Sequence, residues 1–287
     1  MTLVDLWVAV ALAGAVVQAG YETLQKHLTA DVDALRLSYV TSILGSLLLF
    51  PVALWVLSTQ PVSVTLTVVA GTLVAGVANV LALYAFLTAL TQADLSVVSP
   101  LRQSTPLLVA VLEPLVLATA FGPSVILGAF AATLGGYVIL ADESLSSPLA
   151  RVTEPGPLLA LGTAGLYAVA SVAARFVVVR VPSLLFTFLL YVQMALAFGV
   201  LLRRRDGTLP TRALGQRRFL ALGAMTTLRS VLIFAAFALV AAAKATVVLR
   251  VSLVLTVLAG GALFGEQGVG RRLVGAGLVM VGVWLAL

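Results

Sequence analysis

Residues 63–90 read SVTLTVVAGTLVAGVANVLALYAFLTAL, a run that contains no charged side chain. Its apolar residues surround the whole helix that they would form, so that no face is left for water. A helix of this kind is buried in the core of a large protein or spans a lipid bilayer. Because a span needs about 20 largely apolar residues, the run predicts a membrane-spanning helix.

The composition extends this prediction to the whole chain. Of its 287 residues, 61% are hydrophobic and only 10% are charged, whereas soluble domains carry about 25% charged residues. Turn residues and charges divide the chain into ten segments of suitable length, at about 3–27, 34–57, 63–90, 95–120, 123–141, 157–178, 183–202, 217–242, 245–264 and 270–287. We therefore predict an all-α integral membrane protein with ten transmembrane helices.

The two halves of the chain resemble each other at a spacing of about 150 residues. The matching positions are NVLALYAFL at 79–87 with RSVLIFAAF at 229–237, Gly128 and Gly135 with Gly275 and Gly282, and Tyr39 with Tyr191. Five helices is an odd number, so a unit duplicated in tandem enters the membrane upside down the second time. We therefore predict two inverted five-helix repeats, at residues 1–145 and 146–287.

Several chemistries lack the residues that they need. The chain has no cysteine and a single histidine, His27, without a second ligand near it in the sequence. The glycine cluster at 265–270 is not followed by the Gly-Lys-Ser/Thr of a phosphate-binding loop. We therefore expect no metal, no cofactor and no ATPase, and we predict that the protein is not an enzyme.

The positive charge of the chain is concentrated in one predicted loop. The net charge is +6, and the loop cluster comprises Arg203, Arg204, Arg205, Arg212, Arg217 and Arg218. Because these arginines flank membrane segments, we interpret them as topology signals that meet lipid headgroups and not as a nucleic-acid surface. Counted over all loops, Lys and Arg place both termini outside the cytoplasm by the positive-inside rule.

Three arginines fall inside predicted spans: Arg102, Arg229 and Arg250. A central arginine costs about 2.5–3.5 kcal/mol in a membrane helix, so such residues face protein or water and are often functional. Arg229 lies nearest the middle of its span and is the leading candidate to bind an anionic group of a substrate. A structural ion pair is the alternative for Arg229, and reaching to the interface is the alternative for the other two.

The first predicted helix carries one polar face, made of Gln18, Tyr21, Glu22 and Gln25. Contact of this face with lipid would be costly, so we expect it to point inward. We predict that it binds substrate and that Glu22 is a candidate for proton coupling. Hydrogen bonding between helices is the alternative interpretation.

Further candidates lie in other predicted helices. For substrate binding they are Asn79, Gln103, Tyr167 and Ser171, and for proton coupling Glu113. Pro106 frees the carbonyl of Arg102 from its usual helical bond. Interrupted polar helices of this kind point to the binding site of a carrier.

Two segments carry a family pattern, TQADLSVVSPLRQSTPLLVAVLEPL at 91–115 and ALVAAAKATVVLRVSLVLTVLAGGALFGEQGVGRRLVGAGLVMVGVWLAL at 238–287. The pattern is a small residue, Ser/Thr-Val-Val, an apolar run, and then Gly-Glu and Gly-Ala before a closing helix. In this pattern the chain resembles the EamA-like branch of the drug/metabolite transporter superfamily. The resemblance implies a ten-helix secondary carrier of the bacterial inner membrane, with a central cavity and with both termini in the cytoplasm, against the charge count. Glu113 and Pro114 depart from the pattern because they lie within the fourth predicted helix.

The expected function follows from this resemblance. It is the export of amino acids or related carboxylate-bearing solutes by alternating access, with a small-molecule substrate, a coupling proton or counter-substrate, and membrane lipids as partners. Transport of organic anions or nucleotide-like solutes is the first alternative. An intramembrane enzyme or lipid-handling protein that uses Glu22 and Glu113 as acid and base is the second, and a structural membrane scaffold is the third.

Overall fold

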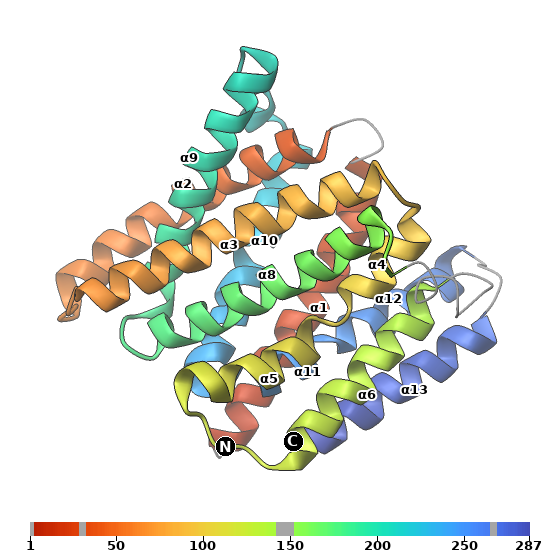
Figure 1. Ribbon diagram of the computed structural model, residues 1–287. Coiled ribbons are helices and arrows are strands. Elements are labelled where there is room, and N and C mark those ends of the chain that lie inside the picture. The colour runs from red at the N-terminus through yellow and green to blue at the C-terminus, as the bar shows by residue number, and fades with distance from the viewer. Residues whose placement is uncertain (1–2, 29–32, 142–151, 265–268) are drawn as a thin grey trace. The chain divides into compact units, whose positions relative to one another are not determined.

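The computed structural model describes residues 3–28, 33–141, 152–264 and 269–287, and these residues are almost entirely helical, without a strand (Figure 1). In chain order the helices are α1 (Leu3–Leu28), α2 (Ala34–Thr59), α3 (Leu66–Leu90), α4 (Leu95–Arg102), α5 (Thr105–Leu117), α6 (Pro123–Leu140), α8 (Pro155–Val178), α9 (Ser183–Asp206), the short 3-10 helix η1 (Thr211–Gly215), α10 (Arg217–Leu239), α11 (Ala242–Leu249), α12 (Val251–Phe264) and α13 (Val269–Ala286). The prediction of an all-α fold is confirmed.

Eight segments of the described chain are long and apolar enough to cross a bilayer. They are Leu6–Gln25, Ala34–Thr59, Leu66–Leu90, Leu95–Leu117, Pro123–Leu140, Pro155–Val178, Ser183–Asp206 and Arg217–Leu239. The prediction of a protein that crosses the membrane many times is therefore confirmed. The last two predicted spans, 245–264 and 270–287, overlap helices α11, α12 and α13, and the count of ten stays a prediction.

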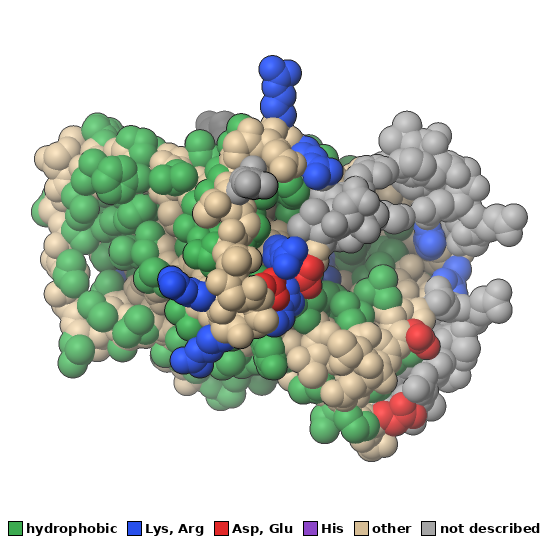
Figure 2. All heavy atoms as spheres, turned by 90° about the horizontal axis from the view of Figure 1, so that it is seen from above, with side chains coloured by type: hydrophobic (Ala, Val, Ile, Leu, Met, Phe, Trp, Pro, Cys, Tyr) green, Lys and Arg blue, Asp and Glu red, His purple; other side chains and the backbone are tan. Residues whose placement is uncertain are grey.

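The distribution of buried side chains suits a protein that is surrounded by lipid. Large apolar side chains point outward, among them Trp55, Leu66 and Leu115, which are 57%, 84% and 76% exposed. Many fully buried positions are small instead, such as Ala75 and Ala82. On the face that Figure 2 draws, many side chains are hydrophobic, and Lys, Arg, Asp and Glu side chains lie among them. Close packing of small residues therefore holds the helices together, as is usual in membranes.

The internal contacts divide the chain into two compact units. Unit 1 comprises Met1–Val80 and Ala173–Leu239, and unit 2 comprises Leu81–Val172 and Val240–Leu287. Each unit therefore combines one segment from the first half of the sequence with one from the second half. The predicted boundary between repeats, at residues 145 and 146, falls outside the described residues.

In unit 1, α1 packs against α10 and α2 packs against α9. Two tyrosine rings lie against two glycines where α2 meets α9. A Cβ at Gly45 would lie 2.9 Å from the Tyr191 ring, and a Cβ at Gly199 would lie 3.1 Å from the Tyr39 ring. Each of the two helices thus contributes one tyrosine and one glycine to this contact.

In unit 2, α6 packs closely against α13 in antiparallel orientation. A Cβ at Gly128 would lie 2.6 Å from the carbonyl oxygen of Gly282, and a Cβ at Gly135 would lie 2.5 Å from the carbonyl oxygen of Gly275. These distances are shorter than any real Cβ contact, so only glycine permits this approach of the two backbones.

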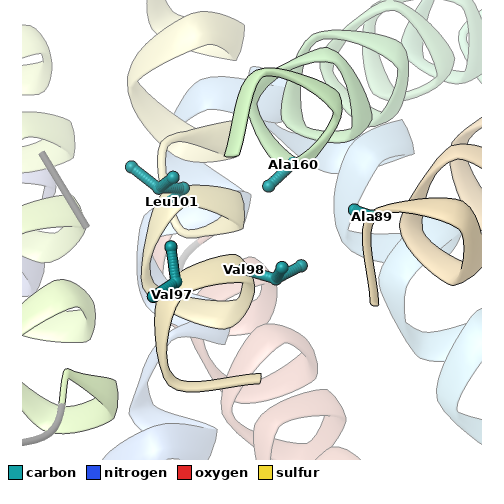
Figure 3. Close-up of a cluster of buried hydrophobic side chains, with 5 residues drawn as sticks. All are labelled: Ala89, Val97, Val98, Leu101 and Ala160. Carbon is teal, nitrogen blue, oxygen red and sulfur yellow. The ribbon is translucent and has the colours of Figure 1, made fainter. Parts of the chain in front are cut away.

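A cluster of small and branched side chains anchors the short helix α4 in unit 2. Figure 3 shows Val97, Val98 and Leu101 of α4 together with Ala89 of α3 and Ala160 of α8. Helix α4 is only eight residues long, and a helix of that length is marginal without tertiary contacts. The cluster therefore holds in place the helix that ends where the chain is interrupted before α5.

Candidate functional site

Arg229 lies on α10, in unit 1, where this helix packs against α1. Its Nη1 donates a 3.1 Å hydrogen bond to Oε1 of Gln18, and its guanidinium carbon lies 4.7 Å from the centre of the Tyr21 ring. Its Nε is buried and has no hydrogen-bond partner among the described residues. The structure thus brings two predicted site residues, Gln18 and Tyr21, to the guanidinium of a third, Arg229, whose Nε donor has no partner among the described residues.

Gln18 connects Arg229 to an acid on the same side of α1. The Nε2 of Gln18 donates a 2.5 Å hydrogen bond to Oε1 of Glu22, one helical turn away. Within the described residues, Arg229 forms no salt bridge. The Glu22 carboxyl and the Arg229 guanidinium are therefore connected by hydrogen bonds through the Gln18 amide and not by a direct salt bridge.

A buried hydroxyl group lies beside this arginine, and sequence reasoning missed it. The hydroxyl of Tyr191 on α9 donates to the backbone carbonyl of Thr226, at 2.8 Å, and lies 2.9 Å from Oγ of Ser230. Tyr191 is 3% exposed, and Ser230 directly follows Arg229 in α10. The signals available were the adjacency of Ser230 to the key arginine and the repeat match of Tyr191, neither of which identifies a polar contact by itself.

The two other predicted residues of unit 1 are less informative. Asn79 on α3 donates its amide to the carbonyl of Ala75, at 2.8 Å, within its own helix. Gln25 lies on the same face of α1 as Gln18 and is half-buried. Their roles in substrate binding stay predictions.

Unit 2 contains a second polar group, formed where two helices are interrupted. Helices α4 and α5 are separated at Gln103, and α11 and α12 are separated at Arg250. Nη1 of Arg250 donates to Oε1 of Gln103, and Gln103 is only 2% exposed. The structure therefore joins two predicted site residues that are 147 residues apart in the sequence.

The interruption between α4 and α5 has the cause that the sequence predicts. Pro106 has no N–H to offer to the carbonyl of Arg102, and the hydroxyl of Thr105 donates to that carbonyl instead, at 3.0 Å. At the other interruption no proline is present, and the backbone N–H of Arg250 bonds to the carbonyl of Val247, three residues back.

Glu113 on α5 is fully buried, at 0% exposure. Its Oε1 accepts a 3.0 Å hydrogen bond from the backbone N–H of Ala242, and its Oε2 accepts a 2.7 Å bond from the N–H of Ala243. These N–H groups open α11, where the helix dipole favours a negative charge. Glu113 therefore ties α5 to the start of α11, and proton coupling by this residue stays a prediction.

The remaining predicted residues of unit 2 have local contacts. The guanidinium of Arg102 lies 4.6 Å from the centre of the Phe86 ring, which is a cation–π contact. Ser171 donates its hydroxyl to the carbonyl of Tyr167, at 2.8 Å, within α8. None of these contacts shows a role in binding.

Ion pairs of unit 1 lie at the start of α2 and the end of α9. Arg36 is 2.9 Å from Asp206, and Arg205 is 2.8 Å from both Asp33 and Asp206. Burial opposes ionisation of Asp33, but the hydrogen bonds from Arg205 and the N–H of Arg36, with the charges of both arginines, outweigh it and hold the pKa of this carboxyl below its usual value. The segments before α2 and after α9 therefore lie on the same side of the unit.

Comparisons with known proteins agree with a transporter fold. A family model described as the EamA-like transporter family matches residues 5–141 and 154–287. No curated protein matches the chain. One solved crystal structure, described only as that of a protein, is similar with a TM-score of 0.74 and 17% sequence identity, over 98% of this chain and 97% of the other. That likeness shows the fold alone. Among the described residues no cluster of acidic or histidine side chains could hold a metal ion.

Proposed function

The chain belongs to the EamA-like transporter family, and on this premise we propose that it exports a small metabolite through a carboxylate that binds to Arg229. Membrane transport of the drug/metabolite type follows from the family. Amino acids are the leading substrate class, because they are small solutes that carry a carboxylate. We base the direction of transport, export, and the location in a bacterial inner membrane on the resemblance of the sequence to the EamA-like branch.

The observation that carries the proposal is the unmatched donor of Arg229. A buried polar group without a partner costs about 1–3 kcal/mol, and more when it is charged. Within the described part of unit 1, Arg229 has an amide and an aromatic ring beside it but no carboxylate in a salt bridge. A ligand anion would supply the missing partner.

The geometry of the guanidinium favours a planar anion. A carboxylate pairs with two parallel N–H groups of arginine, either at the end of the fork or along the side that contains Nε. Gln18 occupies Nη1 at the end, whereas Nε at the side has no partner among the described residues. Because Nε is also buried, we expect the substrate carboxylate to bind along the side, through Nε and Nη2, in a conformation of the transport cycle that opens this side to the ligand.

The proposed mechanism is alternating access between two inverted repeats in a protein of ten spans. The contacts between α6 and α13 support it. A shift of 147 residues takes Gly128 to Gly275 and Gly135 to Gly282. The same shift therefore relates the contact of Gly128 with Gly282 to the contact of Gly275 with Gly135, with the two helices exchanged. Exchanged contacts between antiparallel helices are expected for a twofold axis perpendicular to them. For spanning helices such an axis lies in the membrane plane.

Ligand-dependent stabilisation of the purified protein tests the proposal. The probes are L-amino acids and the matching amino-acid amides, which lack the negative charge. We expect the acids to raise the melting temperature and the amides not to do so. Arg229→Lys should weaken this effect and Arg229→Gln should abolish it, while Arg204→Gln, an exposed arginine at the end of α9, should leave it unchanged. Equal stabilisation of the Arg229→Gln variant would refute the assignment of the site.

The same guanidinium also suits a phosphate group, so organic anions and nucleotide-like solutes form the second candidate class. Nucleoside monophosphates and simple dicarboxylates in the same screen separate the classes. If only nucleoside monophosphates stabilise the protein, and Arg229→Gln loses this effect, nucleotide-like solutes replace amino acids as the proposed substrate class. A dicarboxylate response would move it to organic anions.

A further inference from the structure

Glu22, Gln18 and Arg229 form a continuous chain of hydrogen bonds within unit 1. Gln18 donates to Glu22 through Nε2 at 2.5 Å and accepts from Arg229 through Oε1 at 3.1 Å. An ionised carboxylate can only accept hydrogen bonds, and a guanidinium can only donate them. A glutamine amide between them satisfies both in one orientation only, with its NH2 toward Glu22 and its oxygen toward Arg229. The ionised state of Glu22 therefore fixes which way Gln18 points.

Protonation of Glu22 would reverse this preference. The added proton turns one oxygen of the carboxyl into a donor. The amide of Gln18 already contacts this carboxyl, and its Oε1, which now accepts from Arg229, can accept this proton. When the acid donates to Oε1, or the amide turns to present its oxygen to the acid, Nη1 of Arg229 loses its partner. The guanidinium then has Nη1, Nη2 and Nε for a ligand, and the local charge is one unit more positive.

We propose that Gln18 couples the protonation state of Glu22 to the donors of Arg229, so that a proton and the anionic group of the substrate bind to unit 1 together. This inference rests on the proposed role of Arg229 as an anion site. The proton comes from water and is held by the Glu22 carboxyl, and the anion restores the charge that the proton adds. Because the linkage is reciprocal, the bound anion also favours protonation of Glu22.

The other charged side chains of α9 and α10 lie at the ends of these helices. On α1, among the side chains that the structure describes, the titratable neighbour of Glu22 is Tyr21, whose ring lies against Arg229. On α10 the next charges are Arg217 and Arg218 at the start of the helix. On α9 the buried titratable group is Tyr191. The hydrogen-bonded path from the acid to Arg229 passes through Gln18.

Infrared spectroscopy of the protein with isotope-labelled arginine tests the coupling without a ligand. In a pH titration of the full chain in lipid nanodiscs, the band of the protonated Glu22 carboxyl is assigned by its loss in Glu22→Gln. The bands of Arg229 are assigned by their loss in Arg229→Lys. We expect the Arg229 bands to shift at the pH at which the Glu22 band grows. Arginine bands that do not follow the Glu22 band would overturn the proposal.

Two variants remove the link in different ways. Gln18→Met keeps the size of the side chain but not the amide, and Glu22→Gln keeps the hydrogen bonding but not the titration. In each we expect the pH-dependent shift of the Arg229 bands to be lost. Thr23→Val is the matched control on α1, because its hydroxyl bonds only to the carbonyl of Ala19 in the same helix, and it should keep the shift. A shift retained in either Gln18→Met or Glu22→Gln refutes the coupling, so one folded variant is sufficient.

The result is separable from the test of the proposed function. The Arg229 bands could shift with protonation of Glu22 while no carboxylate raises the melting temperature of the protein. In that case the proposed substrate class is wrong, and the coupling between Glu22 and Arg229 is correct. If amino acids bind through Arg229 but the bands are independent of Glu22, the site stands and the coupling is wrong. Where both hold, wild-type protein should take up protons when an amino acid is added in weakly buffered solution, and the Gln18→Met protein should lose this uptake.

Discussion

Gln103 and Arg250 are hydrogen bonded to each other, although 147 residues separate them, and each stands at the interruption of a helix. Both preceding helices, α4 and α11, are eight residues long. The backbone angles of the two residues also agree, with φ −66° and ψ −8° at Gln103 and φ −67° and ψ −12° at Arg250. The glycines of α6 and α13 have the same spacing. If the two halves of the chain are repeats of one unit, Gln103 and Arg250 occupy equivalent positions of the two copies, and these equivalent positions are in contact with each other.

A first prediction is that the two residues can be exchanged. Arg250→Gln alone should lower the melting temperature, because a hydrogen bond to a charged group contributes about 1.5–3 kcal/mol. Gln103→Arg alone should lower it further, since it opposes two cations in a buried place. The double change Gln103→Arg with Arg250→Gln should recover part of the loss. Thermal unfolding of the purified variants checks this, and a double variant no more stable than Gln103→Arg would show that the two positions are not equivalent.

A second prediction concerns the carboxylate of Glu113, whose two oxygens accept bonds from Ala242 and Ala243. Glu113→Gln leaves one backbone N–H without an acceptor, because the amide NH2 cannot accept. We expect a loss of about 1.5–3 kcal/mol in the free energy of unfolding. The matched control is Asp94→Asn, an exposed acid at the start of α4 that forms no side-chain cap bond. If both changes have the same small effect on thermal unfolding, the bond between α5 and α11 is not important for stability.

A third prediction concerns the contact of α6 with α13. Gly135→Ala and Gly282→Ala each put a Cβ within 2.6 Å of a backbone oxygen, and we expect each to cost about 1–3 kcal/mol through the forced separation of the helices. Gly277→Ala on α13 is the control, because nothing lies within 4 Å of its added Cβ. Its melting temperature should be unchanged or slightly higher, since alanine favours helix. Equal effects at the three positions would mean that close backbone approach does not hold these helices together.

The helical segments could be predicted because each is a long apolar run between turn residues or charges. The ends were less predictable. The seventh predicted span ends at residue 202, whereas α9 continues through three arginines to Asp206 and is capped by Gly207, which has a φ of +72°. The fourth is predicted to continue to residue 120, whereas α5 ends at Leu117 before Ala118, which has a φ of 52°. Charged residues continue a helix beyond the apolar run, and hydropathy does not register this.

The sequence predicts which residues belong to the candidate site but not which of them contact one another. Arg229 and the polar face of α1 stand out because charges and amides are costly in lipid. Their contact with each other depends on which helices pack together, and this is decided by glycines such as Gly20, where a Cβ would lie 2.8 Å from Met225. The helix interruption at Arg250 could not be predicted, because no proline lies near it in the sequence. Tyr191 has the same appearance in the sequence as any tyrosine at a membrane helix.

The last prediction concerns the orientation of the chain in the membrane. The ion pairs of Arg36 with Asp206 and of Arg205 with Asp33 place the segments before α2 and after α9 on one side of unit 1. Four further arginines at the end of α9 and the start of α10 are exposed: Arg203, Arg204, Arg217 and Arg218. Because loops rich in Lys and Arg stay in the cytoplasm, we predict that this side is cytoplasmic. The N-terminus, on the far end of α1, then lies outside.

The chain has no cysteine, so a single introduced cysteine can be labelled without a background. Thr208→Cys lies after α9 on the predicted cytoplasmic side, and Ser63→Cys lies between α2 and α3 on the other; both positions are exposed. A membrane-impermeant maleimide added to intact cells should label Ser63→Cys and leave Thr208→Cys unlabelled until the membrane is opened. The reverse pattern would place both termini in the cytoplasm, as the family resemblance implies. In that case the arginines after α9 face away from the cytoplasm, and the positive-inside rule fails for this protein.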